Sequence, residues 1–309
     1  MTQATLSNFA PAQGRLLDRV LSLRSQPIFA PVDDDGLLLL AEHARSATYR
    51  DGEIVVPEGE PQRGIFVIVE GSLIVSSRGR PVVTLDAGTA FGTLALLARQ
   101  PSALAVAGGE TRTLEVPSAA FEEALDVNHS LLRSALAFTG ERVLRARGNL
   151  PVDPTIPREL DEGSYYAEPK SMVERLLQLR AGGFGYMNLE ALIDLARQMN
   201  EVRYPAGHLI WSAGDYSTHS LSIDYGRVRC TAPDGKHVDV ARGFSLGVMD
   251  VWGARRRAYE ARAETEVIGH RIEFESFLTL LESHVEVGLE VLRGFARNLL
   301  TERAPKEPS

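Results

Sequence analysis

The stretch Phe91-Gly92-Thr93-Leu94-Ala95-Leu96-Leu97-Ala98-Arg99-Gln100-Pro101-Ser102-Ala103-Leu104-Ala105-Val106 decides how the rest of this chain is interpreted. It follows short β-prone segments and glycine turns, and its pattern predicts a brief helix that leads into another strand. The glycine ahead of the apolar turn leaves backbone N–H groups at the helix start without partners. Free N–H groups in this position favour an anion.

Composition limits the function classes that need considering. The 309 residues suggest about two domains, and the contents of 44% hydrophobic and 24% charged residues are ordinary for a protein with a packed core. The net charge of −8 argues against a general nucleic-acid binder. Cys230 is the only cysteine, which excludes an intrachain disulfide and a cysteine-based metal site. No signal peptide and no apolar run of about 20 residues is visible, so we expect a cytoplasmic protein without a membrane partner.

The predicted secondary structure changes along the chain. Two helical patterns come first, and from Tyr49 short β-prone runs punctuated by glycines follow, before residues 121–147 become helical again. Short strands with regular turn signals predict a barrel or sandwich rather than a sheet of alternating strands and helices.

The second half repeats this order at a fixed distance. Six turn residues recur after the same 155 positions (for example, 204 − 49): Tyr49, Gly52, Gly59, Gly71, Gly88 and Gly92 correspond to Tyr204, Gly207, Gly214, Gly226, Gly243 and Gly247. A glycine at a turn marks a backbone conformation that other residues resist, so this register indicates a tandem duplication. We expect domains at 13–147 and 170–303, joined by a proline-rich linker at 148–169 with no apolar period.

Three motifs resemble one family. Tyr49 to Glu60 and Phe66 to Val75 are close to the consensus of cyclic-nucleotide-binding domains, and Tyr204 to Asp215 repeats the first motif. The opening stretch resembles the phosphate-binding cassette of that family, found in the cAMP receptor and in kinase regulatory subunits. The resemblance implies a mainly β fold with flanking helices, in which two jelly-roll domains follow one another. It also implies a cyclic nucleotide or related small ligand, bound here in a non-standard way.

The first cassette lacks the two charged groups of the family pattern. Thr93 stands where the family has a glutamate that accepts the ribose hydroxyl, and Ser102 stands where an arginine pairs with the phosphate. Bonds to charged groups are worth roughly 1.5–3 kcal/mol each, so losing both would weaken binding by about 10²–10⁴-fold. These two hydroxyls either still contact a ligand or are only small polar residues of a vestigial loop. The candidate ligand residues here are Phe91, Gly92, Thr93, Leu94, Ser102 and Ala103.

The second cassette departs further from the pattern. Gly247 is followed by Val248, so the carboxylate is again absent, and the Pro-Arg step is replaced by a run of three arginines. Arg256 is our first choice for a phosphate contact, although the alignment slips here by a residue, and Tyr259 stands near the position of a base contact. The run could equally form a solvated loop or a partner-facing patch, or pair with Asp250 and Glu260.

The sequence gives little support for a metal site, a redox sensor or an enzyme active site. His208, His219 and His237 lack the His-x-His spacing of metal-binding jelly rolls, so we expect no metal. Cys230 has no neighbouring histidine or proline pattern of a haem or redox sensor, and no catalytic triad order or phosphate-binding glycine loop occurs. We therefore expect no catalytic residues and no enzyme activity.

The C-terminal segment 273–300 has the longest amphipathic helical pattern, and 121–147 is its counterpart in the first half. These helices either pack only on their own barrels or pair, within one chain or between chains. The predicted interface residues are Leu289, Leu292, Phe295 and Leu299. The relatives that bind DNA end in a helix-turn-helix that this chain does not show, so protein partners or self-association are expected rather than DNA.

These observations favour a regulatory sensor or adaptor with altered ligand pockets, which acts through protein partners. The alternative is a structural pseudo-domain that binds no nucleotide and serves as a scaffold or assembly component. The two differ in whether the space beside Gly92 and Gly247 is open or filled by side chains.

Overall fold

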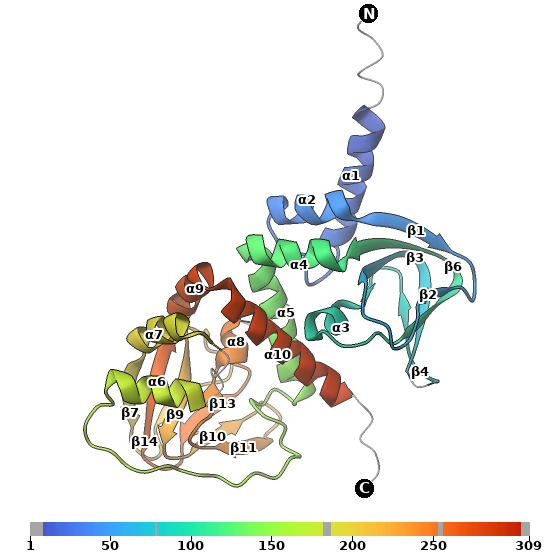
Figure 1. Ribbon diagram of the computed structural model, residues 1–309. Helices are drawn as coiled ribbons and strands as arrows, with labels where there is room; N and C mark the ends of the chain where they lie inside the picture. Colours follow the sequence, from blue (N-terminus) through green and yellow to red (C-terminus); the bar gives the residue numbers. More distant parts are fainter. Residues whose placement is uncertain (1–8, 78, 182–186, 253–255, 304–309) are drawn as a thin grey trace, which may run out of the picture. The chain divides into compact units, whose positions relative to one another are not determined.

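The computed structural model describes residues 9–77, 79–181, 187–252 and 256–303 (Figure 1). Its contacts divide the chain into two compact units. The first contains residues 1–135 and 292–309, and the second contains residues 136–291. Among the described residues, no helix has the length and apolarity needed to cross a bilayer.

The first repeat is a curved antiparallel sheet with helices before and after it. Strand β6 is its centre, because β1, β2 and β3 all pair with it, while β4 and β5 pair with β3. Its core is built from the side chains that these strands turn inward, such as Phe66, Leu73 and Phe91. The elements are α1 (Phe9–Arg24), α2 (Asp34–His43), β1 (Arg45–Tyr49), β2 (Ile54–Val56), β3 (Gly64–Ser77), β4 (Arg80–Asp86), β5 (Ala90–Phe91), α3 (Thr93–Ala98), β6 (Leu104–Pro117), α4 (Ser118–Val127) and the beginning of α5 (His129–Ala146).

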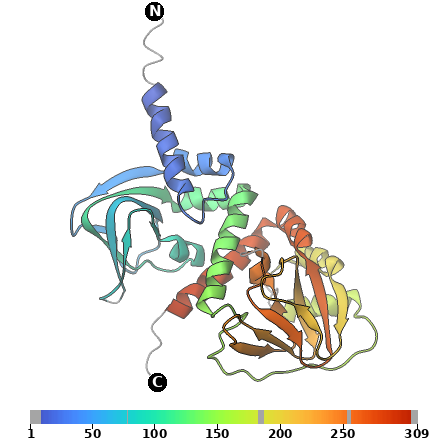
Figure 2. The same cartoon turned by 180° about the vertical axis from the view of Figure 1, so that it is seen from behind.

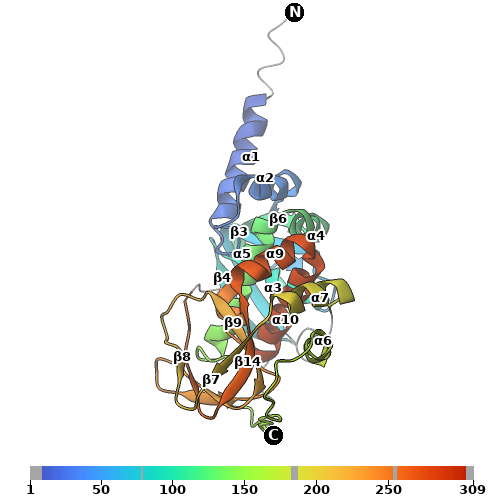
Figure 3. The same ribbon diagram turned by 90° about the vertical axis from the view of Figure 1, so that its left-hand side faces the viewer.

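The second repeat has the same element order, with its strands divided between two four-stranded sheets. One sheet has the order β11-β10-β13-β8 and the other β12-β9-β14-β7, of which β7, β14 and β9 are seen in Figure 3. The elements are α6 (Met172–Ala181), α7 (Leu189–Gln198), β7 (Asn200–Tyr204), β8 (Leu209–Trp211), β9 (His219–Tyr225), β10 (Val228–Thr231), β11 (His237–Val240), β12 (Ser245–Leu246), α8 (Val248–Trp252), β13 (Glu260–Ala263), β14 (Val267–Glu273), α9 (Phe274–Ser283) and α10 (Val285–Arg303). The order of elements confirms the predicted fold of two tandem jelly-roll domains with flanking helices.

The repeated glycines adopt the conformation that their register predicts. All five glycine pairs have positive φ, a region that glycine enters without steric cost. Gly71 differs from its prediction as a turn, because it lies inside β3, where the pairing with β6 shifts register. A side chain at Gly71, or at its counterpart Gly226, would collide with a backbone carbonyl oxygen of the neighbouring strand or loop. Only glycine fits at both places.

The two long helices predicted at 121–147 and 273–300 are each broken. The first breaks between α4 and α5, where Asn128 leaves helical geometry and its side-chain oxygen accepts the N–H of Leu131 at 2.8 Å. Asparagine favours such a capping role over a helix interior. The second breaks at His284, which has φ −140° and ψ 71°. The predictions of single helices were therefore wrong at these two positions.

The segment predicted as a linker is attached to the second barrel. α5 ends at Ala146, and the chain turns through Gly148 and Asn149, both with positive φ. Leu150 and Val152 are then buried in the core of the second barrel, and the rest of the segment runs around the outside of its strands (Figures 1 and 2). The sequence of this segment shows no apolar period because the segment is extended and contacts the barrel only at separate points.

Candidate functional site

The first cassette is built around Gly92, which lies between β5 and α3 with φ 92°. A Cβ atom at this position would collide with the side-chain amide of Gln62. Gln62 is buried, and its Nε2 donates to the carbonyl oxygen of Gly64 at 2.6 Å, while its Oε1 is buried without a partner. The space beside Gly92 is therefore occupied by the protein's own side chain. No sequence signal pointed to Gln62.

Ser102 is turned toward the protein backbone. Its hydroxyl lies 2.6 Å from the carbonyl oxygen of Pro57 and 3.0 Å from that of Glu60, and the side chain is buried. This geometry ties the end of the cassette to the loop between β2 and β3. The other first-repeat candidates are also covered: Thr93 and Leu94 are buried in α3, Phe91 belongs to the barrel core, and Ala103 packs against it.

The strand register settles how the second cassette aligns with the first. An isolated bridge joins Pro61 to Pro101 in the first repeat, and the same bridge joins Tyr216 to Arg256 in the second. The N–H of Gly214 donates to the carbonyl oxygen of Arg257, as that of Gly59 donates to Ser102. Arg257, and not Arg256, therefore stands at the position of Ser102. The sequence alignment slipped here by one residue.

Arg257 is a buried cation at the second cassette. Its side chain is 2% exposed, and its Nη2 donates to the carbonyl oxygen of His219 at 2.6 Å. The guanidinium carbon lies 3.9 Å from the centre of the Trp211 ring, and Nη1 occupies the space beside Gly247. Both Nε and Nη1 lack a hydrogen-bond partner. An arginine with free donors at this position can bind an anion.

Arg256 lies outside the cassette. Its side chain is exposed, Nη1 donates to the carbonyl oxygen of Gly214 at 2.9 Å, and its guanidinium stacks 4.2 Å from the centre of the Tyr216 ring. The predicted alternative of pairing with Glu260 is not what forms, because Glu260 pairs with Arg262 at 3.0 Å. Arg255, the first of the three arginines in the run, lies outside the described residues.

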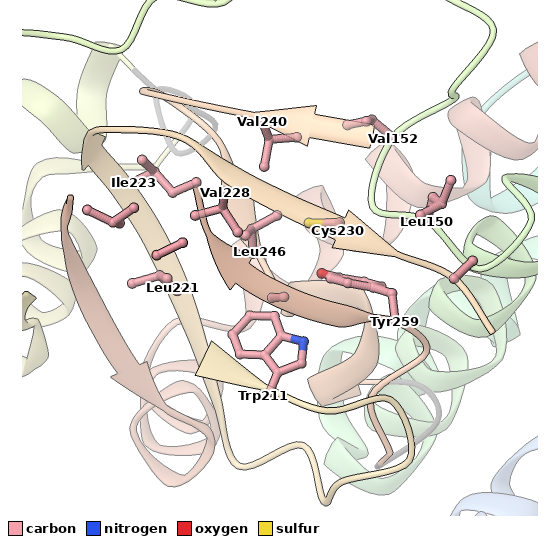
Figure 4. Packing of buried hydrophobic residues seen from close by; sticks show 14 of the residues in the cluster. Leu150, Val152, Trp211, Leu221, Ile223, Val228, Cys230, Val240, Leu246 and Tyr259 are labelled. Atoms are coloured by element: carbon pink, nitrogen blue, oxygen red, sulfur yellow. The ribbon is translucent and has the colours of Figure 1, made fainter. Parts of the chain in front are cut away.

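Tyr259 closes the second cassette from inside the barrel (Figure 4). Its hydroxyl accepts the N–H of Gly247 at 3.0 Å, and its ring centre lies 6.0 Å from that of Trp211. Burial raises the pKa of Tyr259 well above its usual value, so the phenol stays protonated. The backbone donor of Gly247 is thus satisfied by the protein itself. Val248, the next residue, is half-buried at the start of α8.

Asp250 is a second buried charge near this cassette. Its Oδ1 accepts the N–H of Ala258 at 3.0 Å, whereas Oδ2 has no hydrogen-bond partner. Burial raises the pKa of Asp250 to about 6. The carboxylate therefore loses much of its charge in mildly acidic solution.

A cavity of about 520 Å³ lies at the mouth of the second barrel. One wall is the end of α5 with Asn149, and the other is formed by Gly214, Pro233 and the segment from Arg256 to Ala258. All of these residues belong to the second compact unit. In the part of the chain that the structure describes, no group of three or more His, Cys, Asp or Glu side chains could hold a metal ion.

The predicted interface residues are mostly covered within one chain. Leu292, Phe295 and Leu299 are buried, and Leu289 is half-buried. Residues from Leu292 onward form part of the first compact unit. Covering this stripe therefore does not require a second copy, and pairing between chains stays a prediction.

Comparison with known proteins adds the family. Residues 47–128 match the family model described as cyclic nucleotide-binding domain. This match lies within the first repeat. The chain is 26% identical over 165 residues to cyclic nucleotide-gated channel beta-3 of Canis lupus familiaris, and the aligned part covers 50% of the chain and 20% of the channel.

The chain is also similar to one further curated protein and to a solved structure. The cAMP-dependent protein kinase regulatory subunit of Dictyostelium discoideum is 28% identical over 120 residues, which cover 36% of this chain and 37% of that protein. A solved regulatory subunit of a cAMP-independent protein kinase A from Trypanosoma brucei aligns over 89% of this chain and 90% of that one, with 15% identity and a TM-score of 0.38. The chain thus spans about a fifth of the channel and just over a third of the Dictyostelium subunit.

Proposed function

We propose that this protein is a non-catalytic regulatory sensor or adaptor whose two ligand pockets have lost standard cAMP recognition. The observation that carries the proposal is that each cassette glycine faces a side chain of the same repeat. Gln62 fills the space beside Gly92, and Arg257 with Tyr259 fills the space beside Gly247. A phosphate that approached Gly92 as it does in the family would have to displace Gln62, and one that approached Gly247 would meet an N–H already bonded to Tyr259.

A repeated exposed surface supports action through protein partners. α1 carries Leu17-Asp18-Arg19-Val20-Leu21, and α6 carries Val173-Glu174-Arg175-Leu176-Leu177 in matching positions. The outer two residues of both sets are more than half exposed, at 59% and 56% in α1 and at 65% and 63% in α6. The two arginines instead anchor their helices, since Arg19 donates to the carbonyl of Ala41 and Arg175 to that of Met199. Apolar residues that stay exposed in both copies favour an interaction surface.

Calorimetry with the full chain tests the proposal. We expect no binding of cAMP at micromolar affinity, because the acidic residue is absent from both cassettes and the first also lacks the arginine. Thr93→Glu with Ser102→Arg should gain little, since Gln62 still occupies the site. Adding Gln62→Ala to that pair should produce or strengthen binding by roughly 10²-fold or more. Micromolar binding by the unaltered protein would refute the proposal.

The scaffold alternative is favoured by one observation, the apolar filling of the second barrel by Trp211 and Tyr259. If that filling excludes every ligand, the protein should show no thermal shift with cyclic nucleotides, cyclic dinucleotides or simple anions. A ligand at 100 times its Kd would stabilise the fold by about 2.7 kcal/mol, which a thermal-shift screen detects readily.

A further inference from the structure

We propose that the outer face of the first barrel is a docking surface for a second copy of this chain. The face is formed by β2, β6, β3 and β4, which are labelled in Figure 1. It includes none of the candidate ligand residues and none of the predicted interface residues of α10. The inference therefore goes beyond the proposed function, and it does not depend on whether either cassette binds a ligand.

A row of apolar side chains crosses this face from strand to strand. Residues directly opposite each other in neighbouring antiparallel strands lie on the same face of a sheet. Ile54 is paired with Val106, which is also paired with Ile74. Ile74 is in turn paired with Thr84. Ile54 is 58% exposed and Ile74 is 42% exposed, so this row lies on the outside of the barrel. Val82, the extra residue where the pairing of β3 with β4 shifts, adds an apolar side chain that is 65% exposed.

The neighbouring positions on β6 and β3 keep the centre of the face free of charge. Residues two positions apart along a strand point to the same side. On these two strands they are Leu104, Ser76, Gly108 and Ser72. Charges occur instead at the two ends of the edge strand β4, where Arg80 and Asp86 are both exposed. An uncharged centre with charges at its rim is typical of a protein–protein interface, whereas a sheet face in water normally carries polar side chains.

The second barrel shows the same face in a form that suits water. The row in matching register is Leu209, Arg262, Arg229 and Asp239. Arg229 pairs with Asp239 at 2.9 Å, and Arg262 pairs with Glu260 at 3.0 Å. One copy of the fold thus carries ion pairs at the positions where the other exposes apolar side chains. This difference between the two repeats indicates that the face of the first barrel is covered by a partner.

The charges at the ends of β4 favour a second copy as that partner. β4 begins at Arg80 and ends at Asp86, so its two ends carry opposite charges. A two-fold axis that crosses the strands near Val83 stacks two such faces with their strands antiparallel. This rotation brings each Arg80 toward Asp86 of the partner subunit. The apolar row lies close to the axis, because Ile74 is paired with Thr84, the residue after Val83. One arrangement therefore covers the apolar row and brings the opposite charges together.

Sedimentation equilibrium of the full chain measures this assembly. We expect an average mass that rises with protein concentration from 33.8 kDa toward twice that value. Ile74→Arg combined with Thr84→Asp copies the ion pair of Arg229 and Asp239 onto the first barrel, so the fold should be retained. This double variant should weaken dimerisation at least about tenfold, because the contact would now have to bury charged groups. Circular dichroism checks that its fold is unchanged.

A matched pair of substitutions tests the face, and a charge exchange tests its orientation. Ile54→Thr should weaken the dimer about tenfold, whereas Leu209→Thr, at the matching position of the second barrel, should leave it unchanged. Arg80→Glu and Asp86→Arg should each weaken the dimer, because each brings like charges together at two places. An equimolar mixture of these two variants should recover the dimer, since each copy then meets the opposite charge on the other.

Several outcomes would overturn the inference. One is a mass of 33.8 kDa at every concentration up to about 0.5 mM, which would leave the face to a different protein or to solvent. Others are equal weakening by Ile54→Thr and Leu209→Thr, or a dimer that Ile74→Arg with Thr84→Asp leaves intact. Failure of the mixture to recover the dimer would also overturn it, because the choice of a second copy depends on this charge pairing. None of these results bears on cAMP binding, which calorimetry tests separately.

Discussion

Two titratable side chains near the second cassette act on stability in opposite directions. Burial raises the pKa of Asp250 from 3.8 to about 6, so the folded protein keeps a proton that the unfolded chain has released. Its contribution to the free energy of unfolding therefore falls as pH rises through this window. Burial and then the charge of Arg257 lower the pKa of His219 from 6.5 to about 4, so the unfolded chain holds the extra proton. That contribution rises with pH.

We expect the summed contribution of Asp250 and His219 to the free energy of unfolding to change little between pH 4 and 6.5, because the two contributions offset each other. In Asp250→Asn only the His219 contribution remains, so the free energy of unfolding should rise by up to about 3 kcal/mol as the pH is raised from 4 to 6.5. In His219→Gln only the Asp250 contribution remains, so the free energy of unfolding should fall as the pH rises over the same range. Urea denaturation followed at several pH values measures both. Identical slopes in the wild type and the two variants would contradict the assignment.

Individual residues also explain why the candidate site was only partly predictable. The fold-defining glycines were predictable because positive φ restricts the residue type at each of them. Gln62, Arg257 and Tyr259 carry no such signature, since nothing in their spacing states which way a side chain turns. The sequence alignment missed Arg257 by one position because neighbouring arginines cannot be told apart by residue type. The bridge between Tyr216 and Arg256 fixes the register in the structure.

Among the elements, the extended segment before α6 is held by a buried carboxylate. Oδ2 of Asp224 lies 2.9 Å from the hydroxyl of Tyr166, 3.0 Å from Nζ of Lys170 and 2.9 Å from Nδ1 of His270. Burial alone would raise the pKa of Asp224, but the interactions with His270 and Lys170 outweigh it and the pKa is lowered. This cluster joins the segment to β9 and β14.

Asp224→Asn should destabilise the second unit by about 3 kcal/mol, because Lys170 would lose the buried carboxylate with which it pairs. Since the pKa of Asp224 is lowered on folding, the stability that it contributes is present at neutral pH and is lost as pH falls through its folded pKa. Limited proteolysis between residues 158 and 168 should become faster. Asp161→Asn is the control, because its ion pair with Arg242 is exposed and should be worth less than about 1 kcal/mol. Equal effects of the two substitutions would show that the cluster does not hold the segment.

For the whole molecule, the compact units do not coincide with the sequence repeats. The last turns of α5 are part of the second unit, where Leu144 is buried in the barrel core, and the last turns of α10 are part of the first. The first compact unit therefore includes the end of α10, which belongs to the second repeat, and the second unit includes the end of α5, which belongs to the first repeat. The domain boundaries predicted from the sequence, 13–147 and 170–303, stay a prediction.

Cutting the chain after residue 147 should give two fragments that each melt at lower temperature than the intact protein. Fragment 1–147 lacks residues 292–303, among which Leu292 and Leu299 are buried, and losing one such leucine side chain alone typically costs 2–5 kcal/mol. Mixing the fragments should restore part of the loss, as measured by circular dichroism during heating. Fragments that melt like the intact chain, with no change on mixing, would contradict this division.

Residue types at known positions were enough to predict the duplication, the tandem jelly-roll fold and the absence of the family's charged residues from the first cassette. Each of these depends on which residue types stand at fixed spacing, because turns need glycine and barrels need alternating apolar strands. The tertiary structure decided what fills the pockets, where the long helices break and which residues cover the C-terminal stripe. Those outcomes depend on contacts between residues far apart in the chain, such as Tyr259 with Gly247 and Gln62 with Gly92, which no local pattern encodes.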